Sequence, residues 1–520
     1  MLIYYFFVMK KHILFLILSV LITGCRPTGQ LTKYVNPFLG TATLWEPEDL
    51  GYVRKMKQRT WGAEVFPGAS LPNAMVQLSP ITQFRSGAGY QYEDTVIYGF
   101  SHTNKGHWNL LHVPLLPVTG EISPSDYCSK YSHRNESAHP GYYQVFLERY
   151  NVNAELTSTL RCAYHKYTFR KEDDKKLVAD MMRSNNRISD WSIQKVDENT
   201  FTGSQNGEGR IYFYAISNYK IKDIEQVKDD KHEVSLVDFL DSKGSNPLEL
   251  KMGFSFVSIE NARLNLDREQ AGKDFEKIHA EARSKWNDDL SRITVEGGTD
   301  AQKTVFYTAL YHLLIHPNIL QDVNGEYPAM ESDKILTTKG DRYTVFSLWD
   351  TYRNVHQLLT LVYPERQMEM VRTMLDMYRE HGWLPKWELY GRETLTMEGD
   401  PSIPVIVDTW MKGLRDFDVD LAYEAMYKSA TLPGAENLMR PDNDDYMSKG
   451  YVPLREQYDN SVSHALEYYI ADFALSRFAA ALGKKKDAEM FYKRSLGYKH
   501  YYSKEFGTFR PILPDGTFYS

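Results

Sequence analysis

The stretch GYYQVFLERYNVNAELTSTLRCAYHKYTFRK, residues 141–171, decides the fold expected for the first half of the chain. Its apolar residues recur every second position, at Tyr143, Val145, Leu147, Ala154, Leu156 and Leu160. A period of two is typical of strands with one buried and one wet face. Similar short segments, broken by Gly, Pro, Asn and Asp, continue over residues 31–265, so we predict an antiparallel β-sandwich there.

After residue 265, the spacing of apolar residues changes from that of strands to that of helices. The charged segment DREQAGKDFEKIHAEARSKWNDDLSRI predicts one linking helix over residues 266–292. Thr299 is a suitable N-cap for the next helix. Further helical segments are expected at about residues 347–361, 365–380, 403–414, 421–429, 461–482 and 484–499. Residues 293–520 are therefore predicted to form a helical array.

The composition is that of a folded globular protein, with 42% hydrophobic and 25% charged residues. The net charge is −7, and no stretch gathers the Lys and Arg that a phosphate-binding surface needs, so we expect no nucleic-acid partner. Aromatic residues reach 13%, which suits the stacking of rings on sugar faces and equally suits a large core built on sheets.

The N-terminus predicts export. Lys10, Lys11 and His12 precede the run ILFLILSVLITGC, which has the charged, apolar and small-residue order of a secretory signal. Its end resembles a bacterial lipobox, so residues 1–25 are expected to form a lipoprotein signal with Cys25 as the lipidated residue. The protein would then be held by its lipid at a bacterial membrane, facing the periplasm or the cell surface. An uncleaved anchor helix is the alternative.

The remaining cysteines, Cys128 and Cys162, could pair in an exported protein or stay as two separate thiols. No cysteine or histidine spacing in the sequence indicates a zinc site.

Residues 382–401, GWLPKWELYGRETLTMEGDP, hold four carboxylates and two tryptophans. Glycine and proline interrupt regular structure in this stretch, so we expect a loop between helices. Glu393 would lie there among aromatic side chains, where partial desolvation raises a carboxyl pKa and suits the group to donate a proton. A capping or salt-bridged glutamate is the structural alternative.

Two other segments combine aromatic and polar residues. In FSLWDTYR, residues 346–353, Trp349 and Asp350 could grip a sugar by its apolar face and its hydroxyl groups, or belong to an amphipathic helix with an Asp350–Arg353 ion pair. In GFSHTNKGHWN, residues 99–109, the histidines include His102 and lie near a glycine-rich turn. Hydrogen bonding to a substrate or a structural role is expected there, and no metal ligands are assigned.

Seven motifs, in this order, resemble glycoside hydrolase family 92: YVNPFLGT, FPGASLPNAMVQLSP, GYQYEDTVIYGFSHT, HPGYYQVFL, FSLWDTYR, GWLPKWELYGRETLTMEGDPSIPVIVDTW and GYVPL. The resemblance runs from about Tyr34 to the last residue. It implies a β-sandwich followed by an (α/α)6 toroid, and an inverting, calcium-dependent exo-α-mannosidase of the kind exported by gut Bacteroidetes. The substrates implied are N-glycans and mannans with terminal α-linked mannose.

The resemblance also assigns residues. Glu393 falls where the family has its general acid, and Asp350 falls where the family contacts the terminal mannose. Trp349, Trp387, Glu388 and His102 are predicted to support substrate binding. The calcium and general-base segments of the family, His-Gly-Asn-Glu-Pro-Ser-His and Gly-Asn-Asp/Glu-Asp-x-Gly-Gln-Met, do not occur in this sequence, so no metal ligands and no base are predicted.

Two departures from the family bear on function. The loop GFSHTNKGHWN has Asn104 where the family has a histidine, which affects the expected linkage preference. The helical segments are too few for a complete six-hairpin ring, and we expect a partial toroid at 293–520 with reduced activity. A non-catalytic glycan-binding lipoprotein and another α-glycoside-active enzyme of the same architecture are the competing hypotheses.

Overall fold

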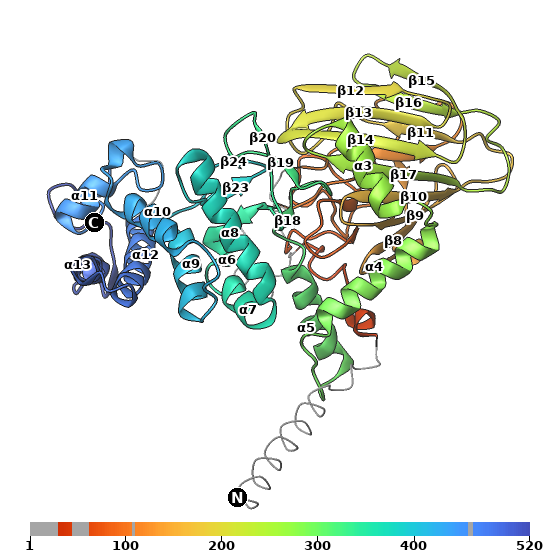
Figure 1. The fold of residues 1–520 in the computed structure, drawn as a ribbon. Helices are drawn as coiled ribbons and strands as arrows, with labels where there is room; N and C mark the ends of the chain where they lie inside the picture. Colours follow the sequence, from red (N-terminus) through yellow and green to blue (C-terminus); the bar gives the residue numbers. More distant parts are fainter. Residues whose placement is uncertain (1–29, 44–61, 107–109, 456–460, 520) are drawn as a thin grey trace, which may run out of the picture.

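A computed structural model describes residues 30–43, 62–106, 110–455 and 461–519. Within these residues, a sandwich of two antiparallel sheets is followed by a helical domain (Figure 1). The predicted fold class is thereby confirmed. Cys25, the expected site of lipidation, and the whole expected signal lie outside the described residues, as do His107 and Trp108.

The sandwich contains two large sheets (Figure 1). The first has the order β1 (Ala69–Ser70), β2 (Gln77–Ile81), β4 (Gly99–Ser101), β5 (Leu115–Val118), β11 (Lys176–Ala179), β16 (Glu233–Phe239) and β15 (Ile221–Lys228). The second has the order β12 (Asp190–Lys195), β13 (Thr200–Gly207), β14 (Gly209–Ser217), β17 (Leu248–Ser255), β10 (Cys162–Thr168), β9 (Val152–Ser158), β8 (Tyr142–Leu147) and β7 (Glu136–His139). A small ribbon pairs β3 (Val96–Ile97) with β6 (Ser129–Lys130).

The stretch quoted first forms three consecutive strands of the second sheet. In the pairing of β8 with β9, Tyr143 lies opposite Leu156 and Val145 opposite Ala154. These four side chains are fully buried in the core, so the alternation in the sequence corresponds to the inner face of the sheet.

In place of one linking helix over residues 266–292, the structure has two: α3 (Ile259–Gln270) and α4 (Phe275–Leu290). The break has a local cause, since Gly272 takes the left-handed conformation and the Asp274 side chain caps the start of α4. Helix α3 packs closely on β17, where a Cβ on Gly253 would lie 2.0 Å from the Ala262 carbonyl oxygen. The change from strand to helix therefore begins before residue 265, and α3 covers the sandwich.

The helical domain is an array of α-helices interrupted by short strands. Its helices are α5 (Asp300–Leu313), α6 (Leu348–Thr351), α7 (Val355–Val362), α8 (Pro364–His381), α9 (Ser402–Met411), α10 (Val419–Thr431), α11 (Asn443–Lys449), α12 (Ser461–Ala481) and α13 (Lys485–Ser495). Its strands are β18 (Asn318–Ile319), β19 (Glu326–Pro328), β20 (Ile335–Thr337), β21 (Tyr343–Thr344), β22 (Phe346–Ser347), β23 (Trp387–Leu389), β24 (Arg392–Glu393), β25 (Tyr502–Ser503) and β26 (Thr508–Phe509). Short 3-10 turns occur at Leu31–Tyr34, His133–Asn135, Gly434–Glu436 and Leu496–Tyr501.

In the helical domain several helix predictions are confirmed, one predicted helix is split and one helix was not predicted. Thr299 caps α5 in a capping box with Gln302, as expected. The helix predicted over 347–361 is split into α6 and α7 by a turn that ends at Asn354, whose φ of −154° lies outside the helical range. Helix α11 was not predicted, because its opening run of Asn and Asp is also typical of turns.

One apolar cluster runs from the sandwich into the helical domain. At the junction, the Tyr390 ring stacks on Phe256 at 4.3 Å, so the segment 382–401 packs directly against the end of β17. Cys128 and Cys162 do not form a disulfide and are two separate thiols. Within the described residues, no helix combines the length and apolar character needed to span a bilayer.

Candidate active site

The segment 382–401 joins α8 to α9, as predicted, and residues 387–393 within it form a short hairpin. Strands β23 and β24 pair around a turn in which Tyr390 and Gly391 have φ of +49° and +80°. Two successive residues with positive φ are typical of tight hairpin turns, and glycine takes this conformation without strain. Strand β22 adds a third strand, with Ser347 opposite Trp387. The hairpin carries Glu393 on one strand and Trp387 and Glu388 on the other.

The Glu393 carboxylate is held by backbone amides. The Lys386 N–H donates to Oε2 at 2.7 Å, while the N–H groups of Trp387 and Leu395 donate to Oε1 at 3.0 and 2.8 Å. Burial raises the pKa of this carboxyl, and the backbone hydrogen bonds oppose that shift. Because Oε1 accepts two bonds and Oε2 only one, Oε2 keeps a lone pair that can carry the proton of a general acid.

Glu388 lies on β23 of the hairpin, directly opposite Glu393 in the strand pairing. It is 0% exposed, and its oxygens accept bonds from Thr344 Oγ1 at 2.9 Å, the Val345 N–H at 3.0 Å and the Gly391 N–H at 2.7 Å. Burial raises its pKa to about 7. These contacts bury the Glu388 carboxyl within the hairpin. It positions the turn that presents Glu393.

A pocket of about 470 Å³ opens beside this hairpin. Its lining comes from both domains: Lys105, Glu208, Trp387, Leu389, Arg392, Glu393, Thr394, Thr396 and Met397. Glu208 stands in the tight turn between β13 and β14, where a Cβ on the neighbouring Gly209 would meet Tyr390 Cβ at 3.3 Å. A raised-pKa carboxyl in a cleft lined by a tryptophan and several polar groups is the arrangement expected of an acid catalyst.

Trp387, one of the predicted binding residues, forms part of this wall. The Lys105 ammonium lies 4.4 Å from the centre of its ring, a cation–π contact that fixes the orientation of the indole. The structure therefore brings together Glu393, Trp387 and Lys105 around one pocket.

Trp349 and Asp350 lie on α6, immediately after the strand that pairs with Trp387. Asp350 is exposed and accepts a hydrogen bond from Ser347 Oγ. The Arg353 guanidinium lies 4.4 Å from the Trp349 ring and pairs with Glu467 at 2.9 Å, in place of the alternative Asp350–Arg353 pair. Neither Trp349 nor Asp350 lines the 470 Å³ pocket, although both adjoin its hairpin.

His102 does not line the 470 Å³ pocket. It is buried inside the sandwich, where Nδ1 contacts the Val113 carbonyl at 2.9 Å and Nε2 contacts His165 Nε2 at 2.9 Å. Burial lowers its pKa to about 3. The structure thus gives His102 a packing role and does not bring it to the pocket.

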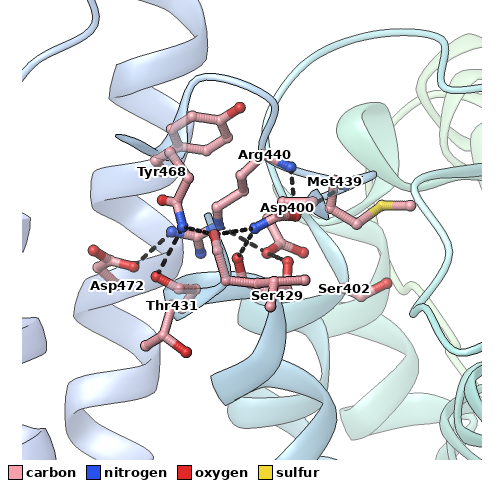
Figure 2. Close-up of polar contacts among 12 residues, drawn as sticks. Asp400, Ser402, Ser429, Thr431, Met439, Arg440, Tyr468 and Asp472 are labelled. Atoms are coloured by element: carbon pink, nitrogen blue, oxygen red, sulfur yellow. Dashed lines mark hydrogen bonds and ion pairs between the residues drawn. The ribbon is translucent and has the colours of Figure 1, made fainter. Parts of the chain in front are cut away.

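The C-terminal end of the segment 382–401 is held by a buried ionic network around Asp400 (Figure 2). Arg440 lies between two aspartates, donating from Nε to Asp400 at 3.0 Å and from Nη1 to Asp472 at 2.8 Å. Asp400 also accepts from Ser429, and Asp472 from Arg494 and Tyr446. Burial alone would raise the pKa of Asp472, but Arg440 and Arg494 lower it below its usual value. Asp400 thereby ties the end of the acid-bearing segment to α10 and α12.

No group of three or more His, Cys, Asp or Glu side chains among the described residues is placed to hold a metal ion. No described residues are therefore assigned to the calcium ion that the family resemblance implies.

Two lining residues come from the sandwich and were not predicted from sequence. Lys105 belongs to the loop GFSHTNKGHWN, where His102 was the predicted residue, and Glu208 lies in the glycine-flanked turn GEG. Glycines on both sides of Glu208 are typical of a hairpin turn. The local sequence around Lys105 and Glu208 does not indicate that these two residues face the helical domain.

Comparison with known proteins gives the family of both domains. Residues 34–267 match the glycosyl hydrolase family 92 N-terminal domain, and residues 261–520 match the glycosyl hydrolase family 92 catalytic domain. An uncharacterized secreted glycosidase of Arthroderma benhamiae is 25% identical over 89% of this chain, which spans 64% of that relative's length.

Two solved structures from Bacteroides thetaiotaomicron share the fold. A family GH92 α-mannosidase in complex with mannoimidazole is 30% identical, with a TM-score of 0.85 over 95% of this chain and 67% of its own. A family GH92 inverting mannosidase is 27% identical, with a TM-score of 0.84 over 95% and 68% of the two chains. Since the two family matches together cover residues 34–520, the chain belongs to glycosyl hydrolase family 92.

Proposed function

We propose that this protein is an exo-acting α-mannosidase that hydrolyses terminal α-linked mannose in N-glycans or mannans. The observation that carries the proposal is the Glu393 carboxyl, which is desolvated, held by three backbone N–H groups and open to a 470 Å³ pocket. The mannosidase relatives support the choice of sugar, since one of them was solved with mannoimidazole and another is described as an inverting mannosidase.

In the proposed reaction, Glu393 Oε2 protonates the glycosidic oxygen as the bond to the leaving sugar breaks. The three N–H groups then stabilise the carboxylate that forms, so charge develops in a site already arranged to receive it. The indole of Trp387 supplies an apolar wall for a sugar face, and Lys105, Arg392 and Glu208 offer polar partners for hydroxyl groups. Inversion at the anomeric carbon requires water to attack from the opposite side of the ring.

Export and anchoring through Cys25 complete the proposal. Both rest on the N-terminal sequence, and export alone is supported by a relative that is described as secreted. Calcium dependence is proposed on the family resemblance alone.

The proposal predicts release of mannose. Chain 26–520 is incubated with α-1,2-, α-1,3- and α-1,6-mannobiose, and proton NMR follows the products. We expect mannose to appear first as the β-anomer, because a single displacement inverts an α-linkage. We further expect a chelator to abolish the reaction and added calcium to restore it.

Kojibiose, maltose and β-mannobiose are the control substrates in this assay. Binding of a mannobiose without any release of mannose would favour the glycan-binding alternative. Release of glucose from the α-glucobioses would favour the other sandwich-plus-toroid enzymes.

A further inference from the structure

The backbone of Glu393 lies at the edge of a small sheet. Strand β24 consists of Arg392–Glu393 alone and is the outer strand of the three-stranded sheet β22–β23–β24. The N–H of the next residue, Thr394, donates to the Trp387 carbonyl at 3.1 Å, on the side of β23. Neighbouring N–H groups along a strand point to opposite sides, so the Glu393 N–H faces away from β23. An outward N–H on an edge strand needs a partner from outside the sheet.

Glu331 is that partner. Its Oε1 accepts the Glu393 N–H at 2.8 Å, and its own backbone N–H donates to the Gly391 carbonyl at 2.7 Å. Glu331 therefore bonds to the residues before and after Arg392, much as a neighbouring strand would. It does not line the 470 Å³ pocket, so it contacts the strand that carries the acid and not the space for substrate.

Glu331 stands at the tip of a second hairpin, formed by residues 329–334 between β19 and β20. Figure 1 shows β19, β20, β23 and β24 next to one another at the junction of the two domains. The tips are in close contact, since a Cβ on Gly391 would lie 3.2 Å from the Ala329 carbonyl oxygen. Glu331 has φ of +49°, which is strained for a residue other than glycine and persists only where surrounding contacts hold it.

A buried ion pair supplies those contacts. The Met330 N–H donates to Glu380 Oε2 at 2.8 Å. The Glu380 carboxylate also accepts both Nη groups of Arg342, at 3.0 and 2.9 Å, and the Tyr327 hydroxyl at 2.9 Å. The side chains of Arg342 and Glu380 are 1% and 6% exposed. A bidentate pair has one favoured geometry, so it fixes Met330 and, through the chain, Glu331.

We propose that Glu331 is a positioning residue for the general acid: its carboxylate holds the backbone of Glu393 so that the acid keeps its distance from the glycosidic oxygen. The inference rests on the proposed function, because it gives a part in proton transfer to a residue that touches no substrate. The three N–H groups that hold the Glu393 carboxylate, from Lys386, Trp387 and Leu395, belong to the same segment as the acid and move with it. Glu331 instead ties the strand of the acid to a separate, braced hairpin.

The test compares three variants of chain 26–520. Glu331→Ala removes the carboxylate, whereas Glu331→Gln keeps a side-chain oxygen that can accept the Glu393 N–H. Alanine and glutamine gain no relief at this positive φ, so the backbone strain stays the same. Asp333→Ala is the matched control, since Asp333 is an exposed carboxylate at the same hairpin tip. The values of kcat and KM are measured on α-mannobiose and on 2,4-dinitrophenyl α-mannoside, whose leaving group departs without protonation.

We expect Glu331→Ala to lower kcat on α-mannobiose by about 10–100-fold, because a displacement of the acid by up to 1 Å has effects of this size. Its KM should stay within about twofold of wild type, and so should its kcat on the dinitrophenyl substrate, since neither depends on the proton of Glu393. Glu331→Gln should restore kcat on α-mannobiose to within about threefold of wild type. Asp333→Ala should behave as wild type on both substrates.

Hydrogen exchange of the Glu393 amide measures the same contact without turnover. In the wild-type chain this amide is bonded to Glu331, which protects it from exchange. We expect it to exchange about tenfold faster in Glu331→Ala and at the wild-type rate in Asp333→Ala.

The outcomes separate the two proposals. A wild-type kcat for Glu331→Ala on α-mannobiose would overturn the positioning role and leave the mannosidase proposal standing. Equal losses on both substrates, or no recovery in Glu331→Gln, would overturn it as well. A folded wild-type chain that acts on neither substrate would contradict the mannosidase proposal. The exchange rate would then decide the placement of Glu393 by Glu331: an unchanged rate in Glu331→Ala would overturn it, and a faster rate would support it.

Discussion

Replacing Glu393 with glutamine lowers kcat on α-mannobiose by about 10²–10⁴-fold, the usual contribution of a positioned general acid. Glutamine keeps the size of the side chain but cannot give up a proton. Its NH₂ group must also face either the Lys386 N–H or the N–H pair of Trp387 and Leu395, so one donor meets another donor. Such a mismatch costs about 1–3 kcal/mol, and thermal denaturation separates this effect from the loss of chemistry.

Substrates with different leaving groups show whether Glu393 acts as a general acid or has only a structural role. A 2,4-dinitrophenyl leaving group departs without protonation, so 2,4-dinitrophenyl α-mannoside should lose far less activity in Glu393→Gln than α-mannobiose does. The pH profile gives a second readout. The acid works when protonated, so kcat on mannobiose should fall as the pH rises through the raised pKa of Glu393, and the variant should lose that limb on the activated substrate.

Glu393→Asp is the matched variant, because it keeps the acid and withdraws it by one methylene. We expect it to retain more activity than Glu393→Gln yet lose roughly 10²-fold, as displacements near 1 Å do. Equal losses on both substrates in Glu393→Gln would contradict the role of general acid.

Removing Arg440 has the largest expected effect on stability. Arg440→Met leaves Asp400 and Asp472 without their shared partner in a site where all three side chains are at most 2% exposed. Breaking a buried ion pair in this way costs about 3–5 kcal/mol, because the remaining charges stay desolvated. Denaturant unfolding followed by tryptophan fluorescence should show the loss in the helical domain.

A double variant of Arg440 and Asp400 serves as a control for the Arg440→Met experiment. Arg440→Met combined with Asp400→Asn removes opposite charges together, and it should destabilise the domain less than Arg440→Met alone because less unpaired charge is buried. Arg477→Met on the exposed side of α12 tests the loss of an arginine as such and should stay within about 0.5 kcal/mol of wild type. A loss for Arg440→Met no greater than for Arg477→Met would show that the buried network adds nothing.

The sandwich could be predicted because the alternation of apolar and polar residues that indicates its strands lies within short stretches of sequence. Strands β8, β9 and β10 each carry their alternation within a few residues, and antiparallel pairing joins strands that are close in sequence. The break at Gly272 and the start of α11 were missed for the same reason, since one glycine in a charged segment and a run of Asn and Asp each fit more than one local structure.

The site was predictable only in part. Glu393 could be identified from its motif and its aromatic neighbours, and the structure places it with Trp387 on one pocket. The burial of His102 in the sandwich and of Glu388 within the hairpin depends on packing between distant segments, which no local pattern reports. The same holds for Lys105 and Glu208, which reach the pocket only because the hairpin of residues 382–401 packs against the sandwich.

The most direct test of the account is a crystal structure of this chain with mannoimidazole. We predict that the ligand lies in the pocket lined by Trp387 and Glu393, with a ring nitrogen about 2.6–3.2 Å from the Glu393 carboxyl. A ligand bound at any other place, with the Glu393 pocket empty, would contradict the assignment of this pocket as the site of mannose hydrolysis.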